Sequence, residues 1–198
     1  MNSVRSKTCG LIIEKIIKKR VFPKIQGNLM RLLLGMPVIN KKVTQKICEE
    51  VTTAFGGNFY EVIVGGAAFN QEVESFMKQI EFPYTVGYGA TECAPIICYA
   101  DWKSFVPGSC GKAALHMEVH IDSPDPENIP GEILCRGLNV MLGYYKNPEA
   151  TEQCIDKDGW FHTGDLGTMD TDGNVFIKGR SKNMLLGANG QNIYPEEI

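Results

Sequence analysis

Residues 86–92 bring together the groups needed to hold a phosphorylated aromatic ligand. Two glycines let a ligand approach the backbone closely, and Tyr88 offers a ring on which a base can stack. Thr91 offers a hydroxyl to a phosphate. Glu92 offers carboxylate oxygens, which are the ligands that Mg²⁺ prefers beside phosphates. This segment therefore predicts a site for a nucleotide and its metal ion.

A second turn of small residues lies upstream. Gly65, Gly66 and Ala67 follow the apolar run 60–64 and precede a predicted helix. Small residues there allow a flat ligand to lie against the backbone, whose N–H and C=O groups can read its edge. If 60–64 and 83–86 are parallel strands, both turns open at the carboxyl edge of one sheet, where open α/β folds bind ligands.

Three separate segments together resemble the adenylate-forming acyl-CoA synthetase superfamily. They are residues 86–92, residues 160–165 (Trp-Phe-His-Thr-Gly-Asp) and residues 179–182 (Gly-Arg-Ser-Lys). Residues 131–137 and 143–151 match further signatures of the superfamily, which we interpret as scaffold. Residues 87–95 and 181–184 are most similar to the bacterial long-chain fatty-acid–CoA ligases. The resemblance is dense from residue 56 onward and weaker before residue 50.

The resemblance implies a role for each turn at the base of the nucleotide. Gly65, Gly66 and Ala67 would contact adenine through the backbone. Tyr88 would stack against the base, with Gly89 next to it in the same cofactor-binding motif.

It also implies roles at the phosphates and the ribose. Thr91 would hydrogen bond to the α-phosphate and Glu92 would bind Mg²⁺, so these two form the predicted catalytic pair. Asp165 and Arg180 would both bind the ribose, since a carboxylate can accept two hydroxyls and a guanidinium has a planar fork of donors. Lys182 would lie at the hinge between a large and a small domain.

The reaction implied by the resemblance has two steps and uses small-molecule partners. A fatty acid carboxylate attacks the α-phosphate of ATP, giving acyl-adenylate and pyrophosphate. The thiol of coenzyme A then displaces AMP. One alternative is an acyl-adenylating enzyme that loads a carrier protein, and another is a non-catalytic nucleotide-binding module.

Composition indicates a reduced, cytoplasmic globular protein. The 198 residues are 43% hydrophobic and 22% charged. The seven cysteines are widely spaced and form no Cys-x-x-Cys pattern, which argues against a disulfide scaffold or a zinc site.

Charge is concentrated at the start of the chain. Residues 1–50 carry eleven Lys and Arg against three Glu, which we interpret as a solvated or covered face, and we expect no nucleic-acid partner. Residues 11–20 form an amphipathic pattern whose isoleucines we expect in the core. Transient contact with the inner face of the membrane is the alternative. Apolar surface exposed by truncation would also allow the chain to form homo-oligomers.

The order of elements predicts an α/β fold. Helices are predicted at 43–55 and from Asn70 to residue 80, with breaks at Gly35, Pro37 and Asn40. Alternation with strands 60–64 and 83–86 predicts a parallel sheet with crossover helices, the second half of the large domain of an acyl-CoA synthetase. Short strands at 118–122, 131–136 and 174–178 predict a small antiparallel, barrel-like subdomain.

We therefore expect three parts. Residues 1–105 form the α/β segment, residues 106–180 form the β-rich subdomain, and residues 181–198 form the hinge and the start of a small domain. One helix interrupts the second part, with Asn147 as N-cap and Pro148 at its first position. Residues 156–159 and 170–174 are predicted turns, the latter in preference to a calcium loop.

Two elements of the superfamily do not occur in this sequence. They are a Ser/Thr/Gly-rich phosphate loop that ends in Lys-Gly and a late catalytic lysine, so the sequence is expected to be an internal segment.

We predict that this polypeptide alone is inactive or nearly so, because catalysis by positioning and charge neutralisation suffers when cationic groups are missing. The measurement is fatty-acid-dependent exchange of pyrophosphate into ATP. A rate near that of a full-length relative would contradict the prediction.

Overall fold

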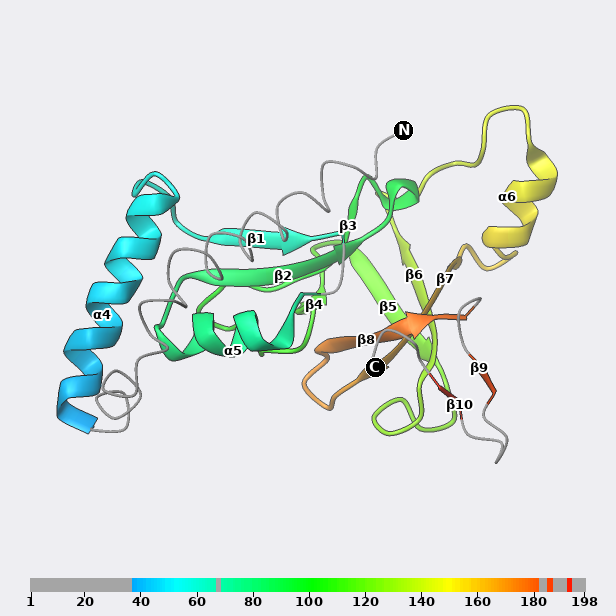
Figure 1. Ribbon diagram of the computed structural model, residues 1–198. Coiled ribbons are helices and arrows are strands. Elements are labelled where there is room, and N and C mark those ends of the chain that lie inside the picture. Colours follow the sequence, from blue (N-terminus) through cyan, green and yellow to red (C-terminus); the bar gives the residue numbers. More distant parts are fainter. Residues whose placement is uncertain (1–36, 67–68, 182–184, 187–191, 194–198) are drawn as a thin grey trace. The chain divides into compact units, whose positions relative to one another are not determined.

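The computed structural model describes residues 37–66, 69–181, 185–186 and 192–193, and the chain divides into two compact units (Figure 1). Unit 1 ends at Thr85 and unit 2 begins at Val86. The predicted helix at 11–20 and the predicted hinge residue Lys182 lie outside the described residues. The predicted boundaries after residues 105 and 180 stay predictions.

The described part of unit 1 begins with helix α4 (Pro37–Ala54), which starts six residues before the predicted helix. The prediction that Pro37 and Asn40 break the chain is wrong. Proline is accepted in the first turn of a helix because the N–H that it lacks would have no partner there. The helix ends as expected at Gly56 and Gly57, both with positive φ. In the described part of the chain, no helix combines the length and apolar character needed to cross a bilayer.

Helix α5 (Gln71–Gln79), which follows α4 in unit 1, confirms the predicted cap. The Asn70 Oδ1 accepts a hydrogen bond from the Val73 N–H at 3.1 Å. Val73, Phe76 and Met77 share one face of the helix and are buried. A cluster of Phe55, Phe59 and Phe82, with ring centroids 5.8–6.5 Å apart, extends this core toward the end of α4.

The first sheet is mixed rather than parallel throughout as predicted, and the predicted α/β class is confirmed. In unit 1, β1 (Val62–Gly65) lies beside β2 (Tyr84–Gly89) and points the same way, and the Val62 N–H donates to the Pro83 carbonyl next to it (Figure 1). β2 continues into unit 2, where it pairs antiparallel with β3 (Ile96–Tyr99). β3 pairs antiparallel with β4 (Lys112–Ala113). The short 3₁₀ helix η2 (Thr91–Cys93) joins β2 to β3.

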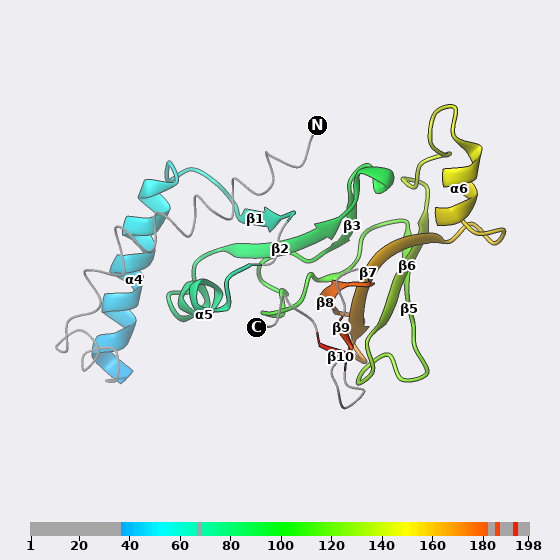
Figure 2. The same ribbon diagram turned by 45° about the vertical axis from the view of Figure 1, so that its right-hand side comes forward.

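The main sheet of unit 2 is antiparallel, as predicted, with strand order β5-β6-β7-β8 (Figure 2). Its strands are β5 (Met117–Asp122), β6 (Gly131–Gly137), β7 (Phe161–Met169) and β8 (Val175–Arg180). In the described residues this order leaves β5 and β8 as edges, so the sheet is open rather than a closed barrel. Strands β9 (Leu185–Leu186) and β10 (Asn192–Ile193) form a separate antiparallel pair.

Local polar contacts set the connections of unit 2 as the sequence predicts. Helix α6 (Pro148–Cys154) starts after Asn147, whose Oδ1 accepts from the Ala150 N–H at 3.1 Å. The predicted turn at 170–174 joins β7 to β8, and the Asp170 Oδ1 accepts from the Asn174 N–H at 2.7 Å. Four cysteines of unit 2 are buried: Cys93, Cys98, Cys110 and Cys135. Cys48 in unit 1 and Cys154 in α6 are half-buried.

The end of β2 tolerates only glycine at position 89. A Cβ on this residue would overlap the backbone carbonyl oxygen of Pro95. This oxygen also accepts a hydrogen bond from the Ala90 N–H at 2.9 Å, so it is fixed in place. The turn from β2 through η2 to β3 therefore requires a residue without a side chain at position 89.

We predict that Gly89→Ala lowers the free energy of unfolding by about 3 kcal/mol, because backbone atoms must shift to admit the methyl group. Gly108→Ala is the control, since Gly108 has φ +83° and open space around it. Only the left-handed conformation is penalised there, at a cost of about 1 kcal/mol. Urea unfolding measures both, and equal losses would contradict the steric argument.

Candidate nucleotide-binding site

Three predicted site residues meet at the carboxylate of Asp165. The Tyr88 hydroxyl donates a hydrogen bond to Asp165 Oδ2 at 2.7 Å. The Arg180 Nε lies 3.0 Å from Asp165 Oδ1 in an ion pair. The Asp165 side chain is 13% exposed, whereas that of Arg180 is 71% exposed. Residues separated by up to 92 positions thus form one polar cluster, which we call the Asp165 cluster.

Sheet register places two members of the Asp165 cluster side by side. Asp165 in β7 and Arg180 in β8 are directly opposed partners. Directly opposite residues of an antiparallel pair have side chains close enough to interact, which explains the ion pair. Tyr88 reaches the same carboxylate from β2, at the point where that strand shifts its register with β3.

Residues of β6 fix the backbone of β7 just before Asp165. The Glu132 Oε1 accepts from the Gly164 N–H at 2.9 Å, and Gly164 has φ +71°. The Thr163 hydroxyl donates to the Ile133 carbonyl at 2.7 Å and accepts from the Asp165 N–H at 3.0 Å. These contacts leave the Asp165 carboxylate little freedom to turn.

Electrostatics keeps Tyr88 in its donor form. Burial, reinforced by the negative charge of Asp165, raises the pKa of the Tyr88 phenol far above its usual range. The phenol therefore stays protonated and donates to the carboxylate. Tyr88 is 7% exposed, so the ring offers only a narrow surface to a stacking base.

The second predicted pair, Thr91 and Glu92, lies on η2. The Glu92 Oε1 accepts a hydrogen bond from the Tyr144 hydroxyl at 2.8 Å, and its backbone carbonyl accepts from the Met141 N–H at 2.7 Å. The bond to Glu92 raises the pKa of Tyr144 to about 12. Cys93 follows directly, and its Sγ lies 3.6 Å from the Sγ of Cys135 in β6.

Glu92 has the chemistry of one metal ligand rather than of a complete metal site. Within the described part of the chain its Oε2 accepts no hydrogen bond, and the side chain is half-buried. The described residues contain no group of three or more His, Cys, Asp or Glu able to hold an ion. A hard cation bound here would take its other ligands from phosphate oxygens and water, which is how Mg²⁺ usually binds beside nucleotides.

The remaining predicted residues are not part of these contacts. Gly65 and Gly66 lie at the end of β1 in unit 1, and Gly66 has φ +80°. Ala67 lies outside the described residues, as Lys182 does. Gly89 is exposed between Tyr88 and η2. The roles predicted for all these residues stay proposals.

His162 lies between two carboxylates. Its Nδ1 lies 3.0 Å from Glu132 Oε2, and its Nε2 lies 3.8 Å from Asp156 Oδ2. The same Glu132 holds Gly164 through its other oxygen. His162 therefore supports the carboxylate that orders the strand before Asp165.

Sequence reasoning missed two residues of this site, Glu132 and Tyr144. Both belong to segments interpreted as scaffold, and both act on a predicted residue that is distant in the sequence. Tyr144 contacts Glu92 across 52 positions, and Glu132 contacts Gly164 across 32. Their side-chain types were a signal, since each supplies a strong polar group, but nothing local identifies the partner.

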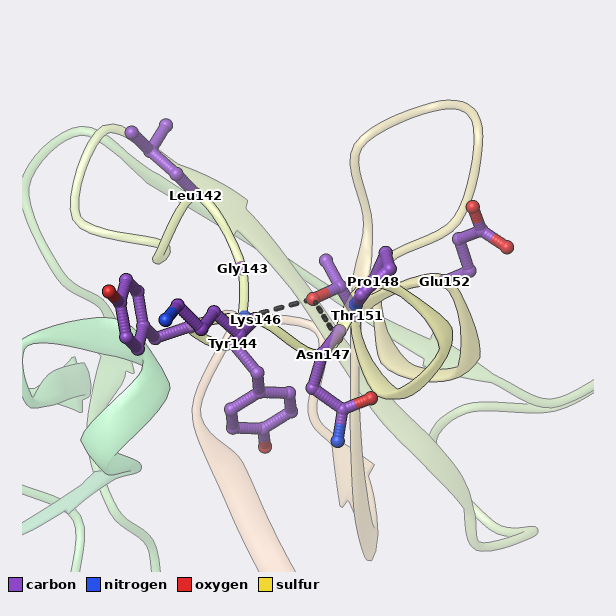
Figure 3. A pocket seen from close by; sticks show the side chains of 9 residues that line it. Leu142, Gly143, Tyr144, Lys146, Asn147, Pro148, Thr151 and Glu152 are labelled. Atoms are coloured by element: carbon purple, nitrogen blue, oxygen red, sulfur yellow. Dashed lines mark hydrogen bonds between the residues drawn. The ribbon is translucent and has the colours of Figure 1, made fainter.

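An open cavity of about 500 Å³ lies in front of helix α6 (Figure 3). The Thr151 hydroxyl closes the loop behind it by accepting from the Tyr144 N–H at 2.9 Å and donating to the Asn147 carbonyl at 3.0 Å. The lining residues are Leu142, Gly143, Tyr144, Tyr145, Lys146, Asn147, Pro148, Thr151 and Glu152.

Curated proteins similar to this chain are coenzyme A ligases. 4-Coumarate–CoA ligase 5 of Oryza sativa subsp. japonica is 41% identical over 69% of this chain and 28% of its own length. Feruloyl-CoA synthase of an Amycolatopsis species is 36% identical over 90% of this chain and 37% of its own length. The chain therefore spans less than two fifths of the length of either relative.

A solved structure and a family model agree with these relatives. O-succinylbenzoate coenzyme A synthetase (MenE) from Bacillus subtilis, in complex with ATP and a magnesium ion, has a TM-score of 0.63 and 25% identity. The match covers 78% of this chain and 34% of that one. The family model described as AMP-binding enzyme matches residues 16–145. The chain belongs to the AMP-binding enzyme family, in the adenylate-forming acyl-CoA ligase group.

Proposed function

We propose that this chain is the adenylate-binding part of an acid–thiol ligase that joins a carboxylic acid to coenzyme A through an acyl-adenylate. The Asp165 cluster is the observation that carries the proposal. It unites residues from three family signatures at one carboxylate, beside a guanidinium that is open to solvent. A nucleoside presents paired hydroxyls, for which a held carboxylate with a neighbouring cation is a suitable acceptor and donor set.

Asp165 keeps acceptor capacity for a ribose. Each carboxylate oxygen has two lone pairs. The Tyr88 hydroxyl occupies one of those on Oδ2 and Arg180 forms an ion pair at Oδ1, which leaves acceptor sites on both oxygens. A ribose would approach from the side of Arg180, whose guanidinium is mostly in water. Tyr88 would keep the carboxylate in the correct orientation and present its narrow exposed edge to the base.

Thr91 and Glu92 would act at the phosphates. Thr91 is exposed on η2, and in the described part of the chain its hydroxyl has no hydrogen bond. It is thus available to a phosphate oxygen. Glu92 would supply one oxygen ligand to Mg²⁺, whose chemistry is to offset the negative charge that builds up on the phosphates. Gly65, Gly66 and Ala67 would contact the adenine edge through backbone groups.

Two classes of carboxylic acid are candidates for the acid substrate. The resemblance at residues 87–95 favours a long-chain fatty acid, whereas the named relatives act, by their names, on 4-coumarate or give feruloyl-CoA. The names of the relatives also support coenzyme A over a carrier protein as the thiol. We take an aromatic acid as the first candidate, because the identity to these relatives extends over most of the chain.

We predict that Asp165→Asn weakens the binding of AMP to this chain by about tenfold, because a neutral amide loses the charged acceptor for the ribose hydroxyls. Isothermal titration calorimetry measures the affinity. Asp122→Asn, at an exposed position of β5, is the matched control and should bind like the wild type. Equal affinities for all three proteins would remove Asp165 from the site.

We further predict that a non-hydrolysable 4-coumaroyl-adenylate analogue, with a sulfamoyl group in place of the phosphate, binds more tightly than AMP. The acyl group adds apolar contact area that AMP lacks. A palmitoyl analogue is the matched comparison. Tighter binding of the palmitoyl analogue would restore the fatty acid as substrate class.

A further inference from the structure

Residues 139–144 hold the loop that carries Glu92. The Asn139 Nδ2 donates to the Cys93 carbonyl at 2.6 Å and to the Ile96 carbonyl at 2.8 Å. The Met141 N–H donates to the Glu92 carbonyl at 2.7 Å. These three bonds hold the backbone of Glu92 and of the residues that follow it, without touching the Glu92 side chain. We call residues 139–144 the latch.

The fourth contact of the latch is different because it acts on the carboxylate. The Tyr144 hydroxyl donates to Glu92 Oε1 at 2.8 Å, and in the described residues Oε2 is left without a hydrogen bond. The contact determines which oxygen faces away from the latch. A phenol is protonated at neutral pH, so Tyr144 is the donor in this contact and Glu92 the acceptor.

The backbone of Tyr144 is fixed by a hydrogen bond to helix α6. Its N–H donates to the Thr151 hydroxyl at 2.9 Å, which ties it to the first turns of α6 (Figure 3). The side chain is 41% exposed, so packing alone does not hold it in place. The hydrogen bond to Glu92 is therefore the contact that gives this ring its direction.

From this geometry we infer that Tyr144 is a positioning residue for the metal site, holding Oε1 of Glu92 so that Oε2 is presented to the cation. The inference rests on the proposed function, because it assumes that Glu92 binds Mg²⁺. A purely structural role, in which Tyr144 only fastens the latch to η2, is the competing explanation. The two differ in what happens to the metal dependence of nucleotide binding.

The experiment measures the affinity of this chain for ATP with Mg²⁺ and with EDTA, and for adenosine, which has no phosphate. The ratio of the two ATP affinities is the metal enhancement. Tyr144→Phe removes one hydroxyl and keeps the ring. Tyr145→Phe is the matched control, since the neighbouring ring is 89% exposed and none of the contacts above involves its hydroxyl.

We expect Tyr144→Phe to reduce the metal enhancement by about tenfold, as for the loss of one hydrogen bond to a charged group, with adenosine affinity unchanged. Tyr145→Phe should leave both quantities at the wild-type values. In a Glu92→Gln background, which should itself lose the enhancement, Tyr144→Phe should have no additional effect.

Three other results would contradict the positioning role, the proposed metal role of Glu92, or both. A Tyr144→Phe variant with the wild-type enhancement refutes the positioning role and leaves the proposed function standing. A variant that loses adenosine affinity in equal measure establishes the structural role instead. If the wild-type chain binds ATP without any metal enhancement, the metal role of Glu92 fails, and the inference fails with it.

Discussion

A carboxylate that is mostly out of water needs partners, and this requirement organises the site in unit 2. Asp165 is 13% exposed, so its charge must be compensated by donors in the protein. Arg180 supplies the charge from the neighbouring strand, and Tyr88 supplies the hydrogen bond from β2. The hydrogen bonds that Glu132 and Ile133 of β6 make with Gly164 and Thr163 of β7 position the strand just before this carboxylate. The site is thus built around one ion whose own stability depends on the strands that carry its partners.

The parts of the fold that local chemistry determines were predictable. Asn70 and Asn147 cap helices where the sequence places them, and Asp170 closes the hairpin before β8. Elements whose identity depends on distant partners were not predictable in the same way. The strands β3 and β7 lack clear alternation, and β7 contains Gly164 and Asp165, which disfavour strands until β6 and β8 pair with them. Pro37 was misread because a helix start and a chain break use the same residue.

The same distinction between local signals and distant partners applies to the candidate site. Tyr88, Asp165 and Arg180 were predicted because family signatures contain them, but the hydrogen bond and the ion pair that join them at the Asp165 carboxylate could be seen only in the structure. Glu132 and Tyr144 lie in signatures that were interpreted as scaffold, yet each holds part of the candidate site, the Gly164 N–H and the Glu92 carboxylate respectively. For each of these two residues, one hydrogen bond to a distant residue connects it to the candidate site. A sequence pattern cannot show which residue lies at the other end of that bond.

The burial of the thiols has a practical consequence. Cys93, Cys98, Cys110 and Cys135 are all buried in unit 2, while Cys48 in unit 1 is half-buried. An alkylating reagent added to the native protein should therefore modify those four positions only when unit 2 transiently opens. Timed mass spectrometry of such a reaction would give an opening rate for the site-bearing unit without any substitution in the sequence.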